Sequence, residues 1–161
     1  MYRKLLLGAA LTALTISAHA NDPKKAIEAL DTRLAKIGAP KVEGFEKTGD
    51  KTVPALFFGA RKINNNYDVV DEIRRSTGAA ATVFVRDGEE FVRVSTNVLT
   101  PDGKRGVGTQ LARNKAYEAL AKGGSWCAEI DVLGTTLNSC YNPIKDGAGK
   151  IVGVTYVGFK K

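Results

Sequence analysis

Histidine is almost absent from this sequence, and its absence excludes several kinds of active site. The 161 residues include one histidine, His19, which lies in an apolar N-terminal stretch. A Ser-His-Asp triad as usually built requires histidine as its general base, and no serine stands in a Gly-x-Ser-x-Gly elbow. The segment GKRGVGT at 103–109 lacks the lysine that a phosphate-binding loop carries before its threonine. We therefore expect neither an enzyme nor a cofactor.

Cysteine is also scarce, since only Cys127 and Cys140 are present. Two thiols without histidine supply too few ligands for a zinc site, and their spacing is not the Cys-x-x-Cys of redox-active pairs. If Leu133 and Gly134 form a hairpin turn, Cys127 stands opposite Cys140 at a non-hydrogen-bonded position, where Cα atoms lie about 4.5 Å apart. A disulfide accepts that distance. We predict a structural bond, and a redox-active pair is the alternative.

Acidic residues are fewer than basic ones, since the sequence has 17 aspartates and glutamates and 24 lysines and arginines. The basic residues are spread along the chain instead of forming the cluster that is typical of a nucleic-acid interface. A positive surface attracts anionic solutes or an anionic membrane face. The charge balance therefore favours a small anionic partner over nucleic acid.

Long hydrophobic runs are missing apart from one short run near the N-terminus, at residues 5–16. Arg3 and Lys4 precede it and Ala18-His19-Ala20 follows, which is the pattern of a secretory signal peptide. The run is too short for a spanning helix, which needs about 20 apolar residues. We expect cleavage after Ala20, a periplasmic protein without a membrane anchor, and a single domain over residues 21–161.

The rest of the chain predicts helices and strands in alternation. An apolar stripe after a proline predicts a first helix from Pro23 to Ile37, and 41–54 is polar and predicts a loop. Further helices are expected over 67–76, capped by Asn66, and over 110–122, capped by Thr109. The last strand, 150–159, is so apolar that it should be central in its sheet. This order indicates an α+β domain with a mainly antiparallel sheet.

The stretch from Thr82 to Val98 predicts a hairpin that turns at Asp87-Gly88, because Asp-Gly suits a tight primed turn. Thr82 should then face Arg93, and Phe84 should face Phe91. Strand side chains alternate between faces, so we expect one apolar face and one polar, arginine-bearing face. The apolar face would carry Val83, Val85, Val92, Val94 and Val98, and the other face Thr82, Phe84, Phe91, Arg93, Ser95 and Asn97.

Three motifs, FVRVSTNV, DGKRGVGT and CYNPIKDGAGKIVGVTYVGF, together closely resemble the extracytoplasmic Cache sensor domains of the Cache 3/Cache 2 type. The resemblance covers roughly residues 56–161. It implies a PAS-like antiparallel sheet of about five strands with a long N-terminal helix packed on it. It also implies that the sheet binds a small molecule. Such domains occur in chemoreceptors and sensor kinases and as free periplasmic proteins, so a membrane-bound sensor is the expected partner.

Arg93 is the leading candidate for a ligand contact. Its planar guanidinium matches a carboxylate bidentately, and the resemblance places its strand in the ligand-binding sheet. Ser95 and Thr82 could add hydroxyl contacts, and Phe84 and Phe91 could wall the cavity. The resemblance adds two positions from the YNPIK motif. The predicted ligand-binding residues are thus Arg93, Ser95, Thr82, Phe84, Phe91, Tyr141 and Lys145.

Alternatives stay open at this point. Arg93 could form a surface ion pair with a neighbour such as Glu89. Cys127 replaces a residue that is often glycine in the family, and Asn138-Ser139 stand where bulkier residues are common, so the type of ligand is open. The first functional hypothesis is a secreted sensor-type domain for a small organic anion or carboxylate. The second is an interaction or structural protein of the cell envelope that uses the same fold without a ligand.

Overall fold

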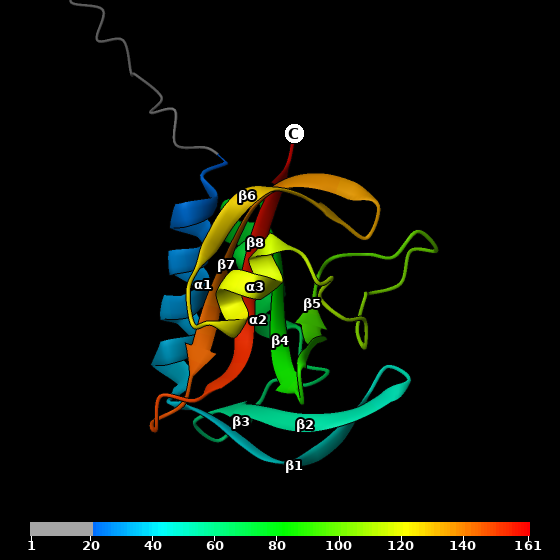
Figure 1. Cartoon of the computed structure of the whole chain (residues 1–161). Helices are drawn as coiled ribbons and strands as arrows, with labels where there is room; N and C mark the ends of the chain where they lie inside the picture. The colour runs from blue at the N-terminus through cyan, green and yellow to red at the C-terminus, as the bar shows by residue number, and fades with distance from the viewer. Residues whose placement is uncertain (1–20) are drawn as a thin grey trace, which may run out of the picture.

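The computed structural model describes residues 21–161 and contains two antiparallel sheets (Figure 1). The predicted signal peptide and its cleavage after Ala20 lie outside the described residues. The larger sheet has five strands in the order β5-β4-β8-β7-β6, and the smaller has the order β1-β2-β3. The α+β class and the five-stranded antiparallel sheet are therefore confirmed. The elements are α1 (Pro23–Ile37), β1 (Pro40–Thr48), β2 (Lys51–Phe58), β3 (Arg61–Lys62), α2 (Asp68–Thr77), β4 (Ala80–Asp87), β5 (Glu90–Thr96), α3 (Lys115–Ala121), β6 (Trp126–Val132), β7 (Thr135–Lys145) and β8 (Ile151–Lys160).

Helix α1 begins and ends where the sequence predicts. The Asp22 side chain accepts a hydrogen bond from the Lys24 amide at 3.0 Å, and a proline occupies the first turn. The helix is tied to β7 and β8 by Asp31, whose carboxylate accepts hydrogen bonds from Asn142 and Thr155 at 2.7 and 2.6 Å. The expected helix packed on the sheet is therefore present.

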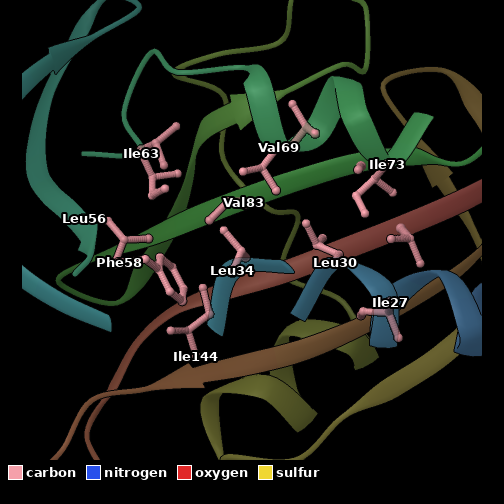
Figure 2. Packing of buried hydrophobic residues seen from close by; sticks show 14 of the residues in the cluster. Ile27, Leu30, Leu34, Leu56, Phe58, Ile63, Val69, Ile73, Val83 and Ile144 are labelled. Atoms are coloured by element: carbon pink, nitrogen blue, oxygen red, sulfur yellow. The ribbon is translucent and has the colours of Figure 1, made fainter. Parts of the chain in front are cut away.

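One face of the large sheet is covered by α1 and α2, and the small sheet closes its end (Figures 1 and 2). Figure 2 shows Leu30 and Leu34 of α1 pointing toward Val83 of β4, with Val69 and Ile73 of α2 beside them. These side chains are almost fully buried. We call this side the helix face; its core is almost entirely aliphatic and supplies most of the apolar burial that stabilises the fold.

The predicted loop at 41–54 is wrong, because these residues form most of the β1–β2 hairpin. Its strands are held by backbone pairing, as in Val42 opposite Leu56 and Thr48 opposite Lys51. Strand β1 exposes most of its side chains, so it shows no apolar alternation from which a strand could be predicted.

The β4–β5 hairpin forms, but its predicted register is wrong. The turn consists of Gly88 and Glu89, with glycine at positive φ in its first position. Arg93 therefore lies opposite Phe84. Val94 is an extra residue that forms a β-bulge, so the next pair after Phe84 and Arg93 is Val83 and Ser95. As a result Ser95 leaves the face that carries Arg93.

The predicted helix at 110–122 is shorter than expected. It spans Lys115–Ala121, and its cap is Asn114, whose side chain accepts from the Tyr117 amide at 3.1 Å. The segment before it, 108–111, runs along the outer edge of β5. There the amides of Gly108 and Leu111 donate to the carbonyls of Arg93 and Phe91. Thr109 thus serves as a partner of β5 and not as a helix cap.

The β6–β7 hairpin and its disulfide are confirmed in the predicted register. Leu133 and Gly134 both have positive φ and form the turn, and Cys127 is bonded to Cys140 with their Cα atoms 4.1 Å apart. Strand β8 lies at the centre of the sheet, as its composition predicts. Within residues 21–161, the helices are too short or too polar to span a bilayer.

Candidate ligand-binding site

The sheet surface under α3 and the 97–114 segment gathers the polar and aromatic side chains, and we call it the α3 face. Residues paired across antiparallel strands point to the same side. The strand registers therefore generate two neighbouring rows on this face. One row reads Thr96, Thr82, Tyr156, Tyr141 and Trp126, and the other reads Arg93, Phe84, Val154 and Pro143.

Arg93 is held in place by both its backbone and its side chain. Its amide donates to the Thr109 carbonyl and its carbonyl accepts from the Gly108 amide. Its Nη1 donates to the Thr109 hydroxyl at 3.0 Å and to the Gln110 carbonyl at 3.1 Å. The guanidinium lies 4.9 Å from the centre of the Phe84 ring. The β5 edge segment thus fixes the orientation of the planar group.

The other edge of the guanidinium is free. Arg93 is 4 % exposed, and its Nε is the one buried side-chain nitrogen or oxygen in residues 21–161 without a hydrogen-bond partner. Nη2 forms no hydrogen bond and Arg93 no ion pair within the same residues. Burial lowers the pKa of Arg93, which reflects the cost of holding this charge away from water. A buried cation without a counter-ion is costly.

The predicted alternative for Arg93, an ion pair with Glu89, is wrong. Glu89 lies 3.6 Å from Arg113, which also binds Glu90 at 2.5 Å. Both pairs are on the surface beyond the hairpin turn. Arg93 is therefore left for another partner.

Two buried tyrosines stand beside Arg93 on the face. The rings of Tyr141 and Tyr156 lie 4.8 Å apart, and the Tyr156 hydroxyl is 3.2 Å from the Ser139 hydroxyl. Burial raises the pKa of Tyr156 to about 12 and that of Tyr141 further. Both phenols are neutral at physiological pH and can donate a hydrogen bond to an anion.

Glycine at position 158 gives Tyr156 its place. A Cβ at Gly158 would approach the Tyr156 hydroxyl to 2.1 Å, so any other residue at this position would force the phenol to move. Tyr156 and Ser139 were not predicted as site residues, because their place depends on the β4–β8–β7 register. The available signal was a tyrosine within a buried strand, since a buried phenol needs a polar partner.

The remaining predicted residues divide between the two faces and the rim. Thr82 and Phe91 share the α3 face, although the Thr82 hydroxyl is already bonded to Thr96 at 2.7 Å. Ser95 lies on the helix face and donates to the Asn66 carbonyl at 2.6 Å. Lys145 is exposed near the end of β7, about 13 Å along the strand from Tyr141. The structure thus brings Arg93, Phe84, Phe91 and Tyr141 together and leaves Ser95 and Lys145 apart.

The aromatic side chains fill much of this face. Phe84, Phe91, Tyr141 and Tyr156 are each at most 1 % exposed. None of the four hollows described over residues 21–161 is lined by Arg93. A ligand at the guanidinium therefore requires the rings to move. Within the same residues, no group of three or more histidine, cysteine or acidic side chains is arranged to hold a metal ion.

The architecture and the sequence agree on a family. A family model described as the Cache 3/Cache 2 fusion domain matches residues 17–161. The chain belongs to this family. Cache membership supports a ligand-sensing role, sensory rather than catalytic, at an extracytoplasmic location.

A solved structure gives a weaker likeness to this Cache domain. The crystal structure of the E. coli DcuS sensor domain has 17 % sequence identity and a TM-score of 0.43. The match covers 57 % of this chain and 63 % of that one. The chain thus matches less than two thirds of that domain, and the likeness carries no argument about a ligand. No curated protein matches the sequence.

Proposed function

We propose that this Cache domain is secreted to the periplasm, with cleavage after Ala20, and binds a small organic anion through a carboxylate. Arg93 is the group that holds the carboxylate. The domain would present the bound anion to a membrane-bound signalling partner. The observation that carries the proposal is the free Nε–Nη2 edge of a buried guanidinium without a counter-ion.

Guanidinium geometry supports a carboxylate in particular. Nε and Nη2 point their N–H bonds in parallel, and a carboxylate accepts such a pair of bonds bidentately. Nη1 is occupied by Thr109 and Gln110, so the free edge has one fixed direction. An anion there would supply the missing acceptor and neutralise the buried charge, and both effects favour binding.

The surroundings support a ligand with one anionic group and a compact body. Phe84 offers a ring beside the guanidinium, and Tyr141 and Tyr156 offer neutral phenols. Lys145, the other predicted cation, is too far along β7 to contact the same small molecule. The site therefore has one cation for one carboxylate.

A calorimetric titration tests the proposal, using a panel of short organic acids and amino acids with the purified protein. We expect at least one carboxylate of the panel to bind the wild-type protein. Its affinity for Arg93→Lys should be at least tenfold lower, because lysine keeps the charge and lacks the planar guanidinium. Arg75→Lys is the matched control, since it makes the same change at an exposed arginine of α2, the helix that covers the opposite face of the sheet. Equal affinity for wild type and Arg93→Lys would contradict the assignment of Arg93.

An envelope interaction protein is the second candidate, and the packing of the aromatic side chains favours it. The rings fill the face, and the hollows described above do not reach Arg93. On that reading Arg93 orders the 108–111 segment and binds nothing else. Failure of the whole carboxylate panel, together with recovery of a specific envelope protein by crosslinking, would support this candidate over the first.

A further inference from the structure

A cleft of about 400 Å³ opens where β4 begins and β8 ends, and the core of the α3 face supplies two of its walls, Val98 and Leu137. We call it the end cleft and define it by Arg74, Val98, Leu137, Phe159 and Lys160. Arg93, Phe84 and the two buried tyrosines do not line it. Its volume is within the range of about 300–1,000 Å³ that is typical of small-molecule sites.

The end cleft combines apolar walls with a cationic rim. Val98, Leu137 and Phe159 are at most 8 % exposed and form the walls. Arg74, from the last turn of α2, and Lys160, from the end of β8, are exposed at its rim. No acidic side chain lines the cleft, and neither cation forms an ion pair within residues 21–161.

Three uncharged polar residues line the end cleft, Asn21, Asn97 and Thr135, and the buried one is Asn97. Asn97 accepts from the Ala81 amide and donates to the Val70 carbonyl, both at 2.8 Å. One of its amide N–H groups and one lone pair of its carbonyl oxygen are thus already engaged within the protein. A molecule in the cleft would contact apolar walls inside and positive charge at the rim.

We infer that the end cleft binds an amphiphilic anion, with its apolar tail between Val98, Leu137 and Phe159. The acidic headgroup lies between Arg74 and Lys160. Burial of the tail removes apolar surface from water, and the headgroup gains two cations that form no close ion pair within residues 21–161. A medium-chain carboxylate is the simplest molecule of this class. The inference does not depend on Arg93 or on the function proposed for it.

A second hollow next to the end cleft makes it possible to distinguish an amphiphilic anion from an acidic peptide. It measures about 470 Å³, shares Arg74 and Asn97 with the cleft, and adds Arg75 and Arg105. Arg105 is bound bidentately to Asp71 at 2.7 and 2.8 Å, so its charge is neutralised. A peptide would extend across both hollows and use Arg75, whereas a single alkyl chain fills the cleft alone.

Titration calorimetry of the purified full chain with decanoate tests the inference. We expect Arg74→Ala and Lys160→Ala each to weaken decanoate binding about fivefold, as expected for a charge pair at a partly exposed site. Arg75→Ala is the matched control, because it removes the same charge from the same helix end without lining the cleft. It should leave the affinity unchanged.

Two further variants locate the bound decanoate. Thr135→Phe fills the cleft from the start of β7, where an aromatic side chain suits a strand, and it should abolish binding. Arg93→Lys should bind decanoate as the wild type does. Loss of binding in Arg93→Lys would move decanoate to the α3 face and overturn the inference.

Three other results would also overturn it. Wild-type protein that does not bind decanoate would exclude the ligand class. Equal weakening by Arg74→Ala and Arg75→Ala would indicate general attraction to a positive surface. Tighter binding of an acidic peptide that depends on Arg75 would assign both hollows to a protein partner.

Discussion

The two faces of the five-stranded sheet differ in how completely their polar groups are satisfied. On the helix face, Asn64 accepts from the Leu56 amide and donates to Thr48 and Pro54. Asn97 accepts from the Ala81 amide and donates to the Val70 carbonyl. On the α3 face, Arg93 keeps a buried edge without a partner.

The difference indicates different roles for the two faces. A face whose polar groups are all paired and whose other side chains are aliphatic contributes stability. A face with an unpaired buried cation carries a cost that a ligand can offset.

The largest effect is expected from a cavity on the helix face. Leu30 is fully buried between α1 and the sheet. Leu30→Ala should lower the free energy of unfolding by about 3–4 kcal/mol, the usual cost of removing a buried leucine side chain. Urea denaturation measures it. Carboxylate affinity of the folded variant should match the wild type, and a large change in affinity would show that the faces are not separate.

Removal of the disulfide should destabilise the edge strand β6 in particular, which it ties to Cys140 in the core of the helix face. Cys127 lies on the edge strand β6, which packs against α3. Because the bond closes a loop with a separation of 13 residues, the double variant Cys127→Ser/Cys140→Ser should lose about 3 kcal/mol of stability. Hydrogen exchange should increase in α3 and β6 more than in α1. A uniform increase would contradict this division.

Alkaline pH should act through the phenols of the α3 face. Since the folded pKa of Tyr156 is raised to about 12 from 10, its contribution to stability is complete below pH 10. It is lost as the pH rises from 10 to about 12, and amounts to about 3 kcal/mol. Tyr156→Phe should reduce the drop in stability between pH 9 and 11.5, measured by urea denaturation. An unchanged drop would exclude Tyr156 as its source.

The smallest effect is expected from Arg93→Met, and its sign is the informative part. Methionine keeps the length of the side chain and removes the unpaired buried charge. Stability should rise by about 1 kcal/mol, because relief of desolvation exceeds the loss of two hydrogen bonds, while carboxylate binding is abolished. Thermal unfolding checks the sign. A fall of more than about 2 kcal/mol would make Arg93 a structural residue.

Local signals were enough to predict several elements of the fold. The proline, the cap and the apolar stripe of α1 all lie within its own segment. The β6–β7 register follows from one turn and places Cys127 opposite Cys140. Strand β1 could not be predicted, since its side chains are mostly exposed and only its backbone pairing defines it.

The sequence predicted those site residues whose place follows from the alternation of side chains along a single hairpin. Arg93, Phe84 and Phe91 share a face as expected, although the turn residues were off by one position. The bulge at Val94 could not be predicted, because it is fixed by contacts with the segment before α2, where the Asn65 amide donates to the Val94 carbonyl. Tyr156 depends on pairing between strands far apart in sequence.

The 108–111 segment has a consequence for solubility. An outer strand such as β5 would otherwise present unpaired amides and carbonyls to other molecules, which invites aggregation. Here the Phe91 and Arg93 backbones are paired with that segment and the Val94 carbonyl with Asn65. Thr109 and Gln110 of the same segment also accept hydrogen bonds from the Arg93 side chain. Any change that breaks these bonds therefore also weakens the segment that covers the aggregation-prone edge of β5.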